Sequence, residues 1–129
     1  MKLLPRDQRP GQIRFAVLGD VEPKPHPVFS NLTRAIDIIN QLHEKDPIDF
    51  VASIGDITHR GTAVQYEAVS PLIQRLEVPI HAIMGNEEVT GGKARFLEHA
   101  ALWNAAHPHA GAPELRFIKR FGPFLFIFI

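Results

Sequence analysis

The sequence predicts an α/β fold: a parallel sheet built from alternating strands and helices, followed by a β-hairpin. Three short apolar runs, each stopped by a glycine, alternate with segments of helical periodicity. The segments between these runs are long enough for the crossover connections that parallel strands require. The chain has 129 residues, of which 45% are hydrophobic, so it is long enough for one packed domain and too short for two ordinary ones.

The first strand is expected at residues 13–18, an apolar run with one arginine that Gly19 stops. A proline-rich loop follows, and apolar side chains then recur at helical spacing over residues 28–42. Either Ser30 or Asn31 is a candidate N-cap, so two starts of this helix remain open.

The second strand is expected at residues 49–54 and also ends at a glycine. Thr62 and Gln65 have the spacing of a capping box, which predicts a helix running to about residue 76. Pro71 lies inside this helix and should kink or divide it, because proline removes a backbone donor and clashes with the preceding turn.

The third strand is expected at residues 78–84, and a weaker period predicts a helix over residues 93–106. Two β-rich segments, 115–121 and 124–129, are separated by a Gly-Pro pair and should form the hairpin. The sequence ends inside its most apolar strand, which would be an aggregation hazard unless covered. We therefore expect either further sequence beyond this strand or a homodimer formed through the unfinished sheet edge.

Each of the first three strands ends in a glycine followed by a polar residue, namely Asp20, Asp56 and Asn86. Ligands of parallel sheets bind outside the carboxyl ends of the strands, so these side chains should meet at one crevice. Carboxylate and amide oxygens suit a divalent cation. The simpler alternatives are caps or turns for the aspartates and a left-handed turn for Asn86. Three further carboxylates lie nearby and are either ligands or solvated loop residues: Glu22, Glu87 and Glu88.

The three strand-end stretches resemble the motifs of calcineurin-like metallophosphoesterases, which carry D-x-H, G-D and G-N-H-[D/E] after successive strands. The matching letters are GDVE at residues 19–22, GDIT at 55–58 and GNEE at 85–88. The segments "DFVASIGDITHRGTAVQYEAV" and "LEVPIHAIMGNEE" are similar to the cyclic-nucleotide phosphodiesterase-like branch, and "LRFIKRFGPFLFIFI" is similar to the strand pair that follows there. The resemblance covers about residues 12–129. It implies the first half of a sandwich of two sheets flanked by helices, so residues 1–129 would form a single partial domain, with 1–11 as a flexible arm.

The resemblance also implies roles for the site residues. Asp20 would bind a first metal ion, Asp56 would bridge two ions, and Asn86 would bind the second ion and touch the phosphate. The ions would be divalent (Mn²⁺, Mg²⁺, Fe²⁺ or Zn²⁺), and a water held between them would hydrolyse a small phosphomonoester or phosphodiester. The later histidine motifs of the family have no counterpart in these 129 residues. The second ion would therefore lack most of its ligands.

Two departures from the family motifs concern histidines. Glu22 stands in place of a metal-binding histidine and favours harder ions such as Mg²⁺ or Mn²⁺. Glu87 stands in place of a catalytic histidine, where an ionised carboxylate would repel phosphate unless a raised pKa made it an acid. We therefore expect a phosphoesterase with impaired activity. The alternatives are a catalytically silent binding or regulatory module and a truncated or engineered chain.

Composition limits the remaining function classes. Lysine plus arginine equals aspartate plus glutamate, 14 against 14, so no basic surplus favours nucleic acid. Cysteine is absent, which excludes disulfides and thiolate ligands and fits a reducing compartment. Charged residues and a proline interrupt the start of the chain before an apolar segment can form, and no run approaches the roughly 20 residues of a membrane helix. We expect a cytoplasmic protein without nucleic-acid or membrane partners. His59 follows Asp56 by three residues and could face the crevice, but a position as an ordinary surface-loop residue is favoured.

Overall fold

A computed structural model describes residues 11–129 of the chain. The expected arm at residues 1–11 lies outside the described residues except for Gly11. The helices and strands, in chain order, are β1 (Phe15–Leu18), α1 (Ser30–Lys45), β2 (Phe50–Ser53), α2 (Ala63–Ile73), β3 (Ile80–Ala82), α3 (Asn86–Gly91), α4 (Lys93–Trp103), a 3-10 helix (Pro108–Ala110), β4 (Phe117–Phe121) and β5 (Phe124–Phe128).

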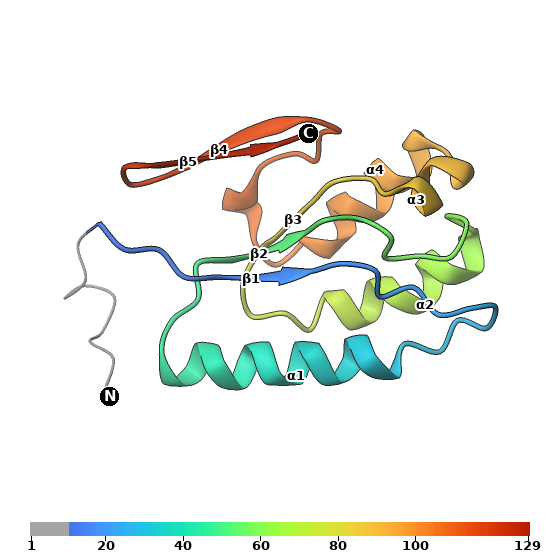
Figure 1. The fold of residues 1–129 in the computed structure, drawn as a ribbon, viewed down its shortest axis with the longest axis horizontal. Coiled ribbons are helices and arrows are strands. Elements are labelled where there is room, and N and C mark those ends of the chain that lie inside the picture. Colours follow the sequence, from blue (N-terminus) through green and yellow to red (C-terminus); the bar gives the residue numbers. More distant parts are fainter. Residues whose placement is uncertain (1–10) are drawn as a thin grey trace.

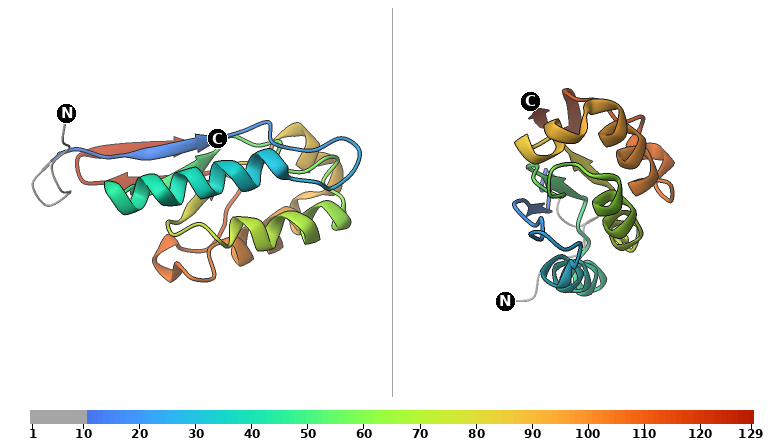
Figure 2. Two further views of the ribbon diagram at one scale, coloured as in Figure 1. Left: turned by 90° about the horizontal axis from the view of Figure 1, so that it is seen from below. Right: turned by 90° about the vertical axis from the view of Figure 1, so that its right-hand side faces the viewer.

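The strands form a parallel three-stranded sheet of order β1-β2-β3 and a separate antiparallel hairpin, β4-β5. The α/β class, the parallel pairing and the hairpin predicted from the sequence are confirmed. Figure 1 shows α1 on one side of the parallel sheet and the hairpin on the other, and the right-hand view in Figure 2 shows α1 and α2 on the side of the strands away from the hairpin. The molecule is thus layered as helices, parallel sheet and hairpin.

The central strand β2 fixes this layering because all four of its residues are buried. Val51 packs into the helical core, whereas Phe50 and Ala52 belong to the cluster beneath the hairpin. Alternating side chains of a strand point to opposite faces, so a strand covered on both faces must be apolar at every position or have its polar groups satisfied.

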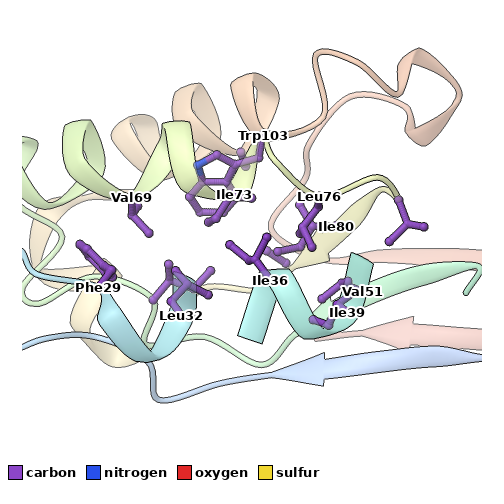
Figure 3. Packing of buried hydrophobic residues seen from close by; sticks show 14 of the residues in the cluster. Phe29, Leu32, Ile36, Ile39, Val51, Val69, Ile73, Leu76, Ile80 and Trp103 are labelled. Carbon is purple, nitrogen blue, oxygen red and sulfur yellow. The ribbon is translucent and has the colours of Figure 1, made fainter. Parts of the chain in front are cut away.

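The helical face of the sheet contains the larger core. In α1 the buried residues Leu32, Ile36 and Ile39 recur at helical spacing and form one stripe. Figure 3 shows Leu32 and Ile36 towards Val69 and Ile73 of α2, and Ile39 beside Val51 of β2. Burial of this stripe stabilises the packing of α1 and α2 against the strands.

The hairpin face is an aromatic cluster. Phe50 of β2 stacks on Phe121 of β4 with ring centroids 4.5 Å apart and on Phe15 of β1 at 5.2 Å. The opposite face of the hairpin is exposed at its apolar residues, which include Ile118, Leu125 and Ile127. The hairpin therefore buries one face only.

The start of α1 differs from the prediction. Its N-cap is Phe29, and neither Ser30 nor Asn31 caps it, because no side chain supplies a capping bond there. The main-chain nitrogen and the hydroxyl of Thr33 both donate to the Phe29 carbonyl, each at 2.9 Å. The first turn is thus closed at the Phe29 carbonyl, and no side-chain cap serves its first N–H groups.

Three details of the α2–α4 region also differ. Thr62 is the N-cap of α2 as predicted, but it makes no side-chain capping bond, and the Gln65 side chain instead accepts a hydrogen bond from the His59 nitrogen at 3.3 Å. Pro71 does not divide α2; the helix ends two residues later, at Ile73. The short helix α3 was not predicted.

Within residues 11–129, no helix has the length and apolar character needed to cross a membrane.

Candidate functional site at the strand ends

The loop after β1 is hydrogen-bonded to the loop after β2. The Asp20 nitrogen donates to the Gly55 carbonyl at 3.3 Å, and the nitrogens of Val21 and Glu22 donate to the Asp56 carbonyl at 3.0 and 3.2 Å. These backbone bonds extend the β1–β2 pairing past the ends of the strands, at the right of Figure 1. Asp20 and Asp56 are therefore carried on adjoining loops, as their positions in the sequence predict.

Both aspartates adopt a left-handed backbone, with φ of 53° at Asp20 and 51° at Asp56. Aspartate tolerates this region better than most residues, and such conformations cluster at functional sites. The left-handed turn considered for Asn86 is wrong: Asn86 is the first helical residue of α3. The capping role considered for Asp20 and Asp56 is also not found, because neither residue is the N-cap of a described helix.

The loop after β3 lies directly against Asp56. A Cβ atom at Gly85 would lie 2.0 Å from Asp56 Oδ1 and 2.3 Å from the Asp56 nitrogen, so only glycine allows this approach. The Glu87 nitrogen donates to Asp56 Oδ1 at 3.1 Å. Hydrogen bonds and close contacts thus link the loop of Asp20 to the loop of Asp56, and the loop of Asp56 to the segment that carries Asn86. The Asn86 side chain is exposed.

Glu88 holds the second and third loops together and is not available as a metal ligand. Its side chain is fully buried, with 0% exposure. One carboxylate oxygen accepts bonds from the nitrogens of Ile57 and Thr58, both at 2.8 Å, and from the Thr58 hydroxyl at 2.9 Å. The other accepts from the nitrogens of Asp56 at 2.9 Å and Gly85 at 2.8 Å. These five donors satisfy the buried carboxylate without a cation.

Glu87 is directed to the loop after β2. Its Oε2 accepts a hydrogen bond from the Arg60 nitrogen at 2.8 Å and lies 3.1 Å from His59 Nδ1. The Arg60 bond, with help from the charges of His59 and Lys24, lowers the pKa of Glu87. The raised pKa that would make Glu87 an acid is therefore not found. His59 is a half-buried partner of Glu87, which corrects its assignment as an ordinary surface residue.

Glu22 is buried but paired with a lysine. Its side chain is 4% exposed, and Oε1 lies 2.7 Å from Nζ of Lys24. The other oxygen, Oε2, is buried and accepts no hydrogen bond from the part of the chain that the structure describes. The bond and the charge of Glu22, with the charges of Glu87 and Asp20, raise the pKa of Lys24. Lys24 was not among the residues predicted for the site, although its position two residues after Glu22 in a proline-rich loop is a visible signal.

The site residues do not by themselves fit a two-metal centre. Across residues 11–129, no group of three or more His, Asp or Glu side chains is arranged to hold a metal ion. The cause is the direction of the three glutamates: Glu88 and Glu87 face backbone donors, and Glu22 faces Lys24. Of the six site residues predicted from the sequence, Asp20, Asp56 and Asn86 remain as candidate ligands.

Comparison with known proteins gives one clear result. No curated protein matches the chain, and no solved structure matches it. The family model for calcineurin-like phosphoesterases matches residues 13–126. This match spans nearly all of the chain, including all three strand-end motifs and most of the hairpin. The chain therefore belongs to the calcineurin-like phosphoesterase family.

Proposed function

We propose that the chain acts on phosphoesters through Asp20, Asp56 and Asn86, as a hydrolase of phosphomonoesters or phosphodiesters with impaired activity. Membership of the family supports a phosphoesterase-type function in general, and divalent metals are typical of that family. The observation that carries the proposal is the joining of three strand-end loops around Asp56, with both aspartates in left-handed backbone. A cyclic-nucleotide or other diester substrate is a finer proposal that rests on the sequence segments alone.

The impairment follows from Glu87. An ionised carboxylate at the position of the family's histidine repels a phosphate dianion, and its hydrogen bond from Arg60 and its contact with His59 keep it ionised. This observation favours a second candidate function, a catalytically silent module that binds a phosphate or phosphoester without turning it over. The two candidate functions use the same loops. They differ only in whether the bound phosphoester is hydrolysed.

The test is hydrolysis of bis(p-nitrophenyl) phosphate in the presence of excess Mn²⁺. The informative variant is Asp56→Asn, because asparagine accepts the same bond from the Glu87 nitrogen and tolerates left-handed backbone, so only the charge is lost. Asp37→Asn, on the exposed side of α1, is the matched control for loss of one carboxylate.

The hydrolase proposal predicts turnover in the parent and in the Asp37 variant and none above the metal-only blank in the Asp56 variant. Absence of turnover in all three, with Mn²⁺ or inorganic phosphate binding that disappears only in Asp56→Asn, would establish the silent module instead. If neither turnover nor binding depends on Asp56, the strand-end site is wrong.

A further inference from the structure

We propose that the ammonium group of Lys24 is the resident cation of the strand-end site and competes with divalent metal for the carboxylates of Glu22 and Asp20. The inference rests on the proposed assignment of these loops as the site. It adds a residue that neither the sequence motifs nor the family match assigns. It also accounts for the disagreement between the family's metal chemistry and the arrangement of this chain's side chains.

The Glu22 side chain is buried and needs a compensating partner. A carboxylate that is only 4% exposed is strongly unfavourable without an opposite charge or several donors. Glu88 obtains such donors from the backbone, but for Glu22 the partner that the structure shows is Lys24, 2.7 Å away. That separation is typical of a charge-assisted hydrogen bond. The lysine thus gives Glu22 the compensation that a bound cation would give.

Lys24 contacts one carboxylate of the site and senses the charge of two others. Its ammonium contacts Glu22, and the charges of Glu87 and Asp20 also act to raise its pKa. The three carboxylates carry more negative charge than the one ammonium balances. A divalent ion would be attracted to the same place but would have to displace the lysine or accept its repulsion.

The lysine can be exchanged for another cation. Pro23 and Pro25 flank Lys24 and restrict the backbone on both sides of it. The Lys24 side chain is nevertheless 58% exposed, so it can rotate into solvent without leaving a cavity. The unpartnered Oε2 of Glu22 would then be available to an incoming ion together with Oε1.

The experiment is calorimetric titration of Mn²⁺ into EDTA-treated, dialysed protein. We compare the parent with Lys24→Met, which removes the ammonium, and with Lys45→Met, which removes one positive charge at the exposed end of α1. The proposal predicts Mn²⁺ affinity at least about tenfold tighter in Lys24→Met, or measurable binding where the parent has none. Lys45→Met should behave as the parent does.

Two further variants secure the interpretation. The double variant Glu22→Gln with Lys24→Met should lose the gain in affinity, because the carboxylate that the lysine had covered is gone. Lys24→Arg keeps the charge and should bind Mn²⁺ no more tightly than the parent; this comparison remains valid if Lys24→Met folds poorly without metal. An equal gain in Lys24→Met and Lys45→Met, no gain in Lys24→Met, or a gain in Lys24→Arg would overturn the proposal.

These outcomes are separate from those of the hydrolysis test. A gain in Mn²⁺ affinity without turnover in any variant would support the role of Lys24 and count against the hydrolase. Turnover that depends on Asp56, with Mn²⁺ affinity unaffected by Lys24, would support the hydrolase and reject the resident cation.

Discussion

Glu22 and Glu88 are two buried carboxylates at the same edge of the sheet, and they are stabilised in opposite ways. Glu88 receives five hydrogen bonds, four from main-chain nitrogens and one from the Thr58 hydroxyl. Glu22 has one charged side chain as its partner and one buried oxygen without a hydrogen bond. Fixed backbone donors cannot be exchanged, whereas a solvent-exposed ammonium can. The comparison separates a structural carboxylate from one that can serve as a cation-binding group.

The largest expected effect is on Glu88. Glu88→Gln keeps the shape but turns an amide NH₂ toward backbone N–H donors and removes the charge that they bind, so the free energy of unfolding should fall by about 3–5 kcal/mol. Urea denaturation measures this change. Glu98→Gln, an exposed residue of α4, is the control and should change stability by less than about 0.5 kcal/mol. A Glu88 variant as stable as this control would show that the carboxylate does not hold the loops.

His81 extends the comparison because it is a buried titratable group that the fold keeps in its neutral form. It lies among the aromatic rings beneath the hairpin, and burial, with the charges of Lys119 and His109, lowers its pKa from 6.5 to about 4. The folded protein therefore keeps His81 neutral while the unfolded chain takes up a proton below pH 6.5. The contribution of His81 to the free energy of unfolding is therefore fully present above pH 6.5 and is lost as the pH falls from 6.5 toward 4.

We expect this loss to be about 2–3 kcal/mol between pH 7 and pH 4. Carboxylates also titrate in this range, so the measurement is the difference between the parent and His81→Phe in urea denaturation at both pH values. The phenylalanine variant should lose less stability on acidification than the parent. Equal losses in the two proteins would mean that His81 is not held neutral.

A smaller effect tests how rigidly the loops are joined. A Cβ at Gly85 would meet the backbone nitrogen of Asp56 at 2.3 Å, whereas a Cβ at Gly19 would meet the exposed side chain of Ile54 at 2.2 Å. A side chain can rotate away but a backbone cannot, so Gly85→Ala should cost about 1–3 kcal/mol and Gly19→Ala less than that. Thermal unfolding of both variants measures the difference, and the reverse order would contradict the described contact of the two loops.

Much of this fold follows from the sequence, because apolar runs stopped by glycines identify the strands and helical periodicity identifies α1, α2 and α4. The same pattern placed Asp20, Asp56 and Asn86 at one edge. It did not reveal which of three nearby glutamates points inward. Glu88 follows Gly85 by three residues, the spacing of a capping interaction, but its bonds to residues 56–58 depend on how closely the loops approach in space.

Other features depend on tertiary contacts that spacing does not encode. The left-handed backbone at Asp20 and Asp56 accompanies the hydrogen bonds that tie the loops together, whereas the sequence suggested a left-handed turn only as an alternative for Asn86. Lys24 was overlooked because a lysine beside a glutamate in a loop is most often an ordinary exposed pair, and the burial of Glu22 is visible only in the structure.

Lys24 occupies the position of a bound cation among the strand-end carboxylates in this account. The most direct measurement is the anomalous scattering of Mn²⁺ in crystals of the parent and of Lys24→Met. We predict a manganese peak in the lysine variant at about 2.0–2.5 Å from carboxylate oxygens of Glu22 or Asp20, with Glu88 still bound to its backbone donors, and a weaker or absent peak in the parent. A peak of equal strength in both proteins, or manganese bound only at other residues, would contradict the account.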